Sequence, residues 1–161
     1  MDADRANCLP APIFVLGAAR SGTSLLFHLI SSARGTWSAY RELHRPYEWD
    51  VGLEPIVARG ESNALGAERA TPDAVARIRR TLFRAVSNRE LLDFPSDWLP
   101  RTGIWLGRGA RVANRLLRRP LRVVEKNPKH CFRVPFLRAV FPDARFLFLY
   151  RHARPNIHSL M

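Results

Sequence analysis

Small, polar and cationic side chains gather in a short loop near the start of the sequence: Gly17, Ala18, Ala19, Arg20, Ser21, Gly22, Thr23 and Ser24. An apolar run at 13–16 precedes this loop, and an apolar stretch with helical spacing follows it. The loop would therefore join the carboxyl end of a strand to the N-terminus of a helix. Backbone N–H groups at such a helix start bind phosphate-like anions, and small residues let the anion approach closely. We expect an anion site here; the alternative is a tight structural turn.

The loop differs from the phosphate loop of ATPases at an informative position. Gly17 and Gly22 have the spacing of the Gly-x-x-x-x-Gly-Lys-Ser/Thr pattern, but Thr23 stands where that pattern has Lys. The cation lies inside the loop instead, at Arg20. The apolar run at 145–150 ends in a cation rather than in a magnesium-binding acid. We therefore expect a phosphate-like ligand that is held without a metal.

Two more cations follow apolar runs later in the chain. Lys126 comes after 121–125, and Arg151 comes after 145–150. Ligands of α/β proteins bind at the carboxyl ends of parallel strands, so Arg151 is expected where such a ligand would lie. Ser159 lies on the helix expected after Arg151, near enough to share an anion with it. Taken singly, each cation has a simpler alternative, which is a solvated side chain at the end of a strand.

The sequence around these residues alternates the patterns of strand and helix. Thr71-Pro72-Asp73 is a typical helix start, with a hydroxyl cap, a proline at the first position and an acid in the first turn. The alternation predicts an α/β fold with a central parallel sheet. The predicted strands are 13–16, 121–125 and 145–150, and the predicted helices are 24–32, 71–88, 108–119, 131–141 and one that begins near 155. Residues 35–63 are predicted to be irregular, and residues 94–109 to be a loop.

The bulk properties indicate one basic domain. The chain has 161 residues, enough for a single core, and its 26 Lys and Arg against 14 Asp and Glu give a net charge of +12. That charge favours an anionic partner, but no recognition-helix or aromatic RNA-binding pattern is found, so nucleic acid is not expected. No apolar run is long enough to span a membrane, and residues 1–12 do not resemble a signal peptide. Cys8 and Cys131 form no metal-binding pattern and do not suggest a disulfide, so a reduced, cytoplasmic setting is expected.

These motifs together resemble those of the sulfotransferase family. Residues 12–26, with Arg20-Ser21-Gly22-Thr23-Ser24, resemble the loop that binds the 5′-phosphosulfate of the donor 3′-phosphoadenosine-5′-phosphosulfate. Arg151 and Ser159 resemble the pair that binds the donor's 3′-phosphate. Lys126, in Glu125-Lys126-Asn127-Pro128, resembles the Lys-x-Pro element of the tyrosylprotein and related bacterial branches. The resemblance implies a phosphate-loop-like three-layer α/β/α fold, in which 13–32 and 121–161 carry the donor site.

The resemblance also implies roles for individual side chains. Arg20 and Lys126 would neutralise charge that develops on the departing phosphate. The 5′-phosphate would be held by Ser21, Gly22, Thr23 and Ser24. A base must take the proton of the acceptor. The related branch has a Glu at nearly the place of Glu42, and His44 and Glu48 are rivals for this role.

Family members are usually longer than this chain, so the sequence is expected to be the N-terminal part of such a domain, truncated at its C-terminal side. A natural short protein and a fragment that binds the donor without catalysing are both left open. The acceptor is a hydroxyl or amine of open identity: a carbohydrate, a lipid, a small alcohol or a peptide tyrosine. A phosphate-loop kinase or NTPase and a basic nucleic-acid-binding protein are the rival functions.

Overall fold

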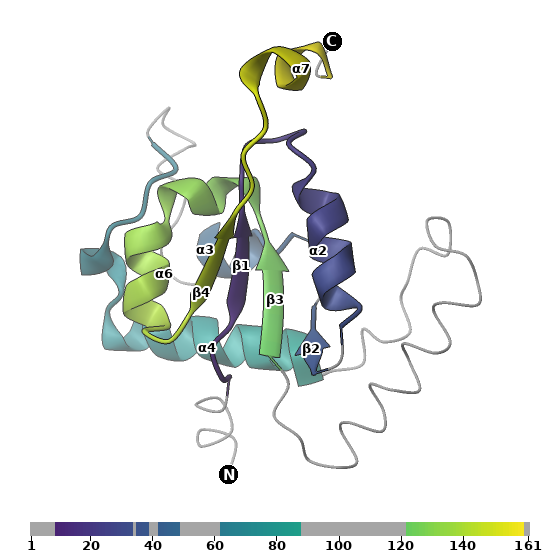
Figure 1. Ribbon diagram of the computed structural model, residues 1–161. Helices are drawn as coiled ribbons and strands as arrows, with labels where there is room; N and C mark the ends of the chain where they lie inside the picture. Colours follow the sequence, from purple (N-terminus) through teal and green to yellow (C-terminus); the bar gives the residue numbers. More distant parts are fainter. Residues whose placement is uncertain (1–8, 34, 39–41, 49–61, 88–121, 160–161) are drawn as a thin grey trace.

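The computed structural model describes residues 9–33, 35–38, 42–48, 62–87 and 122–159. Within these residues the strands form a parallel sheet in the order β2-β3-β1-β4 (Figure 1). The strands are β1 (Ile13–Leu16), β2 (Thr36–Trp37), β3 (Arg122–Lys126) and β4 (Arg145–Phe148). Strand β1 therefore lies inside the sheet, between β3 and β4, which come from the C-terminal part of the sequence. The predicted parallel α/β sheet is confirmed.

The sheet is the middle of three layers, because alternate residues of a strand face opposite sides. Phe14 and Leu16 of β1 belong to one hydrophobic cluster, and Val15 belongs to another. Helix α2 (Thr23–Ser31) packs through Phe27 against the Val15 side. Helices α4 (Pro72–Ser87) and α6 (Val134–Val140) pack on the Phe14 side (Figure 1). The predicted three-layer arrangement is therefore confirmed.

The larger of the two clusters combines aliphatic and aromatic side chains. Phe14 is fully buried, stacks on Phe146 with ring centroids 5.6 Å apart, and lies 5.8 Å from the ring of Phe141. Ile78 and Leu82, one turn apart on α4, complete this side of the core. Each fully buried side chain of this kind contributes about 1.5–3 kcal/mol to folding. This packing fixes β1 and β4, whose carboxyl ends carry two of the predicted site segments.

Short helices fill the connections. They are α3 (Arg45–Glu48), η2 (Ala67–Arg69), η3 (Pro128–Phe132) and α7 (Ala153–His158). Thr71 caps α4 as predicted, since its hydroxyl accepts a hydrogen bond from the Ala74 N–H at 3.3 Å. Helix α7 lies beyond the carboxyl ends of the strands (Figure 1). Among the described helices, none has the length and apolar character needed to cross a bilayer.

Several sequence-based boundaries were wrong. The helix predicted over 131–141 is two pieces, η3 and α6, because Arg133 between them has a non-helical φ of −124° and a proline lies in the first turn of α6. Residues 35–63, predicted to be irregular, contain β2 and α3. The loop predicted over 94–109 and the basic helix predicted over 108–119 lie outside the described residues.

Candidate functional site

The glycine-rich loop turns tightly between β1 and α2. Gly22 takes a left-handed φ of 97° at the start of α2, and Arg20 takes a φ of 64°. A Cβ on Gly17 would lie 2.7 Å from the Leu149 carbonyl oxygen, so the backbone at Gly17 passes the residue after β4 too closely for a side chain. The start of α2 has no side-chain cap hydrogen bond, which leaves the loop side of the helix available to an anion.

The hydroxyls of this loop have different surroundings. Ser21 is buried, and its Oγ donates to the Ala18 carbonyl at 2.6 Å, so this hydroxyl holds the loop closed. Thr23 is also buried. Ser24 is exposed and accepts a hydrogen bond from Lys126. Of the predicted phosphate-binding hydroxyls, the structure thus presents Ser24 outward, while Ser21 supports the backbone.

The predicted 3′-phosphate residues contact this loop directly. The Arg20 Nε donates to both the Oγ and the carbonyl oxygen of Ser159, at 3.1 and 3.2 Å. The Arg151 Nη1 donates to the Arg20 carbonyl oxygen at 2.8 Å. Three residues from opposite ends of the sequence therefore form one exposed, cationic cluster, as expected if β1 and β4 are neighbours.

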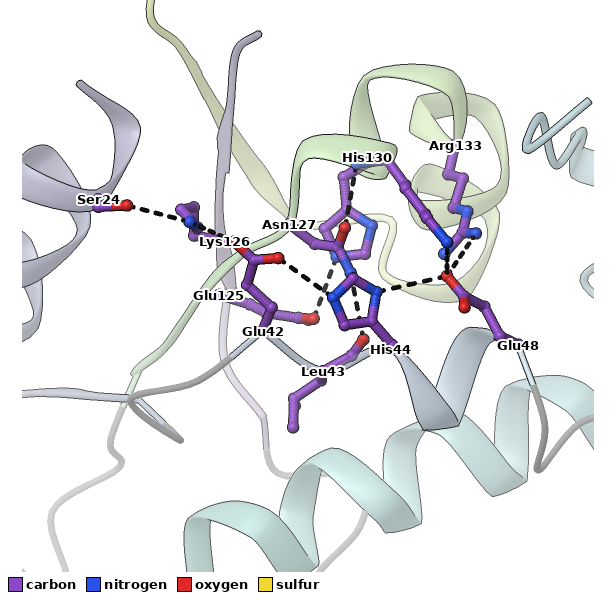
Figure 2. A network of polar contacts seen from close by, with 11 residues as sticks. Ser24, Glu42, Leu43, His44, Glu48, Glu125, Lys126, Asn127, His130 and Arg133 are labelled. Carbon is purple, nitrogen blue, oxygen red and sulfur yellow. Dashed lines mark hydrogen bonds and ion pairs between the residues drawn. The ribbon is translucent and has the colours of Figure 1, made fainter. Parts of the chain in front are cut away.

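Lys126 links the loop to the predicted base. Successive residues of β3 face opposite sides, so Lys126 points toward α2 while Glu125 points into the other layer. The Lys126 Nζ donates to the Ser24 Oγ at 3.1 Å and forms an ion pair with Glu42 (Figure 2). The Lys126 side chain is only 12% exposed and that of Glu42 is 32% exposed. A hydroxyl, a cation and a carboxylate thus meet at the carboxyl end of β3.

His44 lies on the other side of Glu42. Its Nε2 is 3.1 Å from the Glu42 Oε2, and its Nδ1 is 3.5 Å from the Glu48 Oε1 (Figure 2). Asn127 completes the contacts, with its Nδ2 3.3 Å from the His44 Nδ1. The three residues considered as bases therefore form a continuous row, with Glu42 at the Lys126 end.

Glu48 is the buried end of that row. Its Oε1 accepts from the Lys129 Nζ at 2.8 Å and from the Arg133 Nη2 at 3.1 Å. Burial acts to raise the pKa of Glu48, but the hydrogen bonds from these two cations outweigh burial and lower its pKa below the ordinary value. Glu48 is therefore an anion that holds α3 to η3 and α6, which suits a structural role better than proton transfer.

A second buried polar group lies behind Lys126 and was missed by the sequence reasoning. Glu125 accepts from the Tyr47 hydroxyl at 2.6 Å and contacts the His130 Nε2 at 3.1 Å, and all three side chains are buried. Burial, followed by the neighbouring Glu125 charge and hydrogen bond, raises the pKa of Tyr47 well above its ordinary value. The group ties α3 to the end of β3, which supports the strand that carries Lys126.

Asn127 was also missed, although the sequence holds a signal for it. Asn followed by Pro128 is a typical cap and first position of a helix, and Asn127 does cap η3 by accepting from the Lys129 N–H at 3.0 Å. In the described part of the chain, hydrogen bonds and ion pairs therefore gather six of the predicted site residues into two groups. One contains Arg20, Arg151 and Ser159; the other contains Ser24, Lys126 and Glu42.

The sequence and the fold of this chain were compared with those of known proteins and protein families. A search of curated proteins finds no match to this sequence. The crystal structure of a sulfotransferase from Mycobacterium tuberculosis is similar at a TM-score of 0.41 and 16% sequence identity. That similarity covers 93% of this chain and 48% of the mycobacterial protein, so the chain spans about half the length of that protein. The model of the sulfotransferase family matches residues 12–161. Since this match covers nearly the whole chain, the protein belongs to the sulfotransferase family.

Proposed function

We propose that this chain binds 3′-phosphoadenosine-5′-phosphosulfate and transfers its sulfuryl group to an acceptor hydroxyl or amine. The observation that carries the proposal is the placement of Lys126 between Ser24 of the anion loop and the carboxylate of Glu42. Sulfuryl transfer needs a cation at the departing phosphate and a base at the incoming acceptor. The cation and the carboxylate lie side by side here, next to a loop suited to phosphate.

The proposed donor site runs along the carboxyl ends of β1 and β4. The backbone of residues 17–24 would hold the 5′-phosphosulfate at the start of α2. Arg151 and Ser159 would hold the 3′-phosphate, next to Arg20 of the 5′-phosphosulfate loop. In the structure, Arg20 donates to Ser159 and Arg151 donates to the Arg20 carbonyl oxygen. Arg20 and Arg151 are exposed, and Ser159 is partly exposed. A phosphate with several acceptor oxygens would bind such donors more strongly than a neutral carbonyl does.

The proposed reaction is an in-line displacement at sulfur. The bond between sulfur and the bridging oxygen of the phosphosulfate breaks, and a bond forms from the acceptor oxygen or nitrogen to sulfur. The bridging pair of electrons stays with the phosphate, where Lys126 and Arg20 would balance the new charge. The acceptor proton moves to a Glu42 oxygen. As in phosphoryl transfer, most of the rate would come from alignment and charge balance.

Calorimetry with 3′-phosphoadenosine-5′-phosphate, the product that remains after transfer, tests the donor site. The titration is run without magnesium, with ATP as the comparison ligand. Arg151→Ala is expected to abolish binding, whereas Arg138→Ala, which removes an exposed Arg from α6, should leave it unchanged. Selective binding of the 3′-phosphate compound supports the proposal. Magnesium-dependent binding of ATP would instead support a nucleotide kinase or NTPase. If the folded chain does not bind 3′-phosphoadenosine-5′-phosphate, the donor assignment is overturned.

A further inference from the structure

Asn127 has an amide orientation that its surroundings determine. The side chain is fully buried, and one of its atoms, Oδ1, accepts the Lys129 N–H at 3.0 Å. A backbone N–H can only donate, so the oxygen of the amide must lie on that side. The Nδ2 then faces the Leu43 carbonyl at 3.4 Å and the His44 Nδ1 at 3.3 Å. The Leu43 carbonyl can only accept, which supports the same orientation.

This orientation favours one tautomer of His44. An amide nitrogen donates and does not accept, so its contact at 3.3 Å calls for a lone pair on the His44 Nδ1. The Glu48 Oε1 also faces Nδ1, but at 3.5 Å it is farther away, and it already accepts from Lys129 and Arg133. The proton of the neutral ring is then on Nε2. The Nε2 lies 3.1 Å from the Glu42 Oε2, and a carboxylate oxygen accepts a hydrogen bond from it. A chain of donors thus runs from Asn127 through His44 to Glu42.

Glu42 is consequently held at both of its oxygens. Oε1 pairs with Lys126, and Oε2 accepts from His44. Two directed contacts, one at each oxygen, fix the plane of a carboxylate. With only one contact, the carboxylate could still rotate around that hydrogen bond. These contacts matter for Glu42 because it lies outside the described helices and strands, so its side chain is oriented by its polar partners.

We propose that His44 is a positioning residue for Glu42, kept by Asn127 in the tautomer that donates from Nε2. The inference rests on the proposed function, in which Glu42 takes the acceptor proton. The inference also distinguishes Glu42 from His44 as candidates for the base. In the neutral ring Nε2 carries a proton and the Nδ1 lone pair accepts from Asn127, so neither nitrogen is free to receive the acceptor proton. Glu42 keeps further lone pairs on both oxygens.

The test uses the intact chain and needs no knowledge of the natural acceptor, because water can serve as the acceptor hydroxyl. The donor carries radioactive sulfur, and the release of labelled inorganic sulfate is measured for the wild type and for variants. His44→Leu removes the donor and should slow release roughly 10-fold to 100-fold, the cost expected for a misplaced reacting group. His44→Gln places an amide N–H near the position of Nε2 and should restore release to within about threefold of the wild type. His28→Leu, the same change at an exposed His of α2, is the matched control.

Further measurements separate positioning from folding and from proton transfer. The affinity for 3′-phosphoadenosine-5′-phosphate should be unchanged within about twofold in both His44 variants, since they lie away from the Arg151 cluster. The double variant Glu42→Gln with His44→Leu should be no slower than Glu42→Gln alone, because His44 acts only through Glu42.

Each outcome bears on the inference. Normal release by His44→Leu while Glu42→Gln is inactive would overturn the positioning role and leave the proposed function intact. Loss of release in His44→Gln as severe as in His44→Leu, together with normal release by Glu42→Gln, would make His44 the base instead. A wild type that neither binds the product nor releases sulfate above the buffer rate would overturn the proposed function first.

Discussion

At the scale of single residues, Glu42 is the carboxylate on which the proposed proton transfer depends. Glu42→Gln keeps the shape but cannot accept a proton, so sulfate release from the donor should fall by about 10²–10⁴-fold. Binding of 3′-phosphoadenosine-5′-phosphate should persist, since the predicted phosphate contacts come from other residues. Glu68→Gln, at an exposed position of η2, is the control. Release at the wild-type rate by Glu42→Gln would exclude Glu42 as the base.

Gly17 gives a second prediction at this scale. A methyl group there would meet the Leu149 carbonyl and the Thr23 methyl, each at 2.7 Å. Gly17→Ala should therefore lower the free energy of unfolding by about 2–5 kcal/mol through strain and overlap. At Gly35, which has a φ of 78° and open space around it, alanine should cost only about 1–2 kcal/mol. Urea unfolding of both variants measures the difference, and equal losses would show that the close approach at Gly17 is unimportant.

The placement of individual candidate residues could be predicted from the sequence where a local motif marks them. The loop at 17–24 and Arg151 each stand at the end of an apolar run, and the structure places both at one edge of the sheet. The orientation of Asn127 could not be predicted, because it depends on Leu43 and His44, which come from a distant part of the chain. The burial of Ser21 also depends on how the loop turns, which its residue type does not reveal.

At the scale of elements, Glu48 joins α3 to η3 and α6 through Lys129 and Arg133. A lowered pKa means that the folded state favours the charged form, so its stabilisation is complete above the ordinary value of 4.5 and is lost as the pH falls through the lowered value. Glu48→Gln should lower the free energy of unfolding by about 3 kcal/mol near neutral pH, because it leaves the buried Arg133 without its charge partner.

The same variant should approach the wild type in acid. Urea unfolding at a series of pH values checks this, since the difference between the two proteins should shrink as the pH falls below the ordinary carboxyl value. A difference that is constant with pH would mean that Glu48 stabilises the elements by packing alone.

The elements themselves were predictable to the extent that their patterns are local. The strands that begin at Ile13 and Arg145 are short apolar runs, and the helix from Pro72 has a clear cap; their starts were predicted correctly. The strand predicted over 145–150 ends earlier, at Phe148. Strand β2 has two residues, and it forms because Thr36 and Trp37 pair with β3 across the sheet. So short a strand leaves no pattern in the sequence, since tertiary pairing determines it.

At the scale of the whole molecule, the net charge of +12 predicts two kinds of anion binding. Duplex DNA should bind weakly through many cations at about 50 mM salt and dissociate by about 200 mM salt, and Arg151→Ala should not change this. Binding of 3′-phosphoadenosine-5′-phosphate should survive the higher salt and depend on Arg151. Fluorescence anisotropy of labelled DNA and calorimetry compare the two ligands. DNA binding that resists salt and requires Arg151 would favour a nucleic-acid function.

Other whole-molecule expectations stay predictions: the single domain, the donor-site ranges 13–32 and 121–161, and the cytoplasmic setting. The contacts of the described sheet and site do not determine the domain organisation, the ligand or the compartment of the protein. The identity of the acceptor is of the same kind, because loops outside a sheet commonly select it.

The strand order has a consequence for how the protein is made. Ile13 of β1 pairs with Val124 and Arg145, and Thr36 of β2 pairs with Arg122, so among the described strands the partners of both early strands come from the second half of the chain. During synthesis, β1 and β2 cannot form these backbone pairings until β3 has left the ribosome, so their apolar side chains stay exposed until then. Such non-local pairing folds slowly and exposes the chain to aggregation in the meantime. Recovery of soluble protein should therefore improve when translation is slowed or chaperones are supplied, and β3 is the segment whose arrival allows the sheet to close.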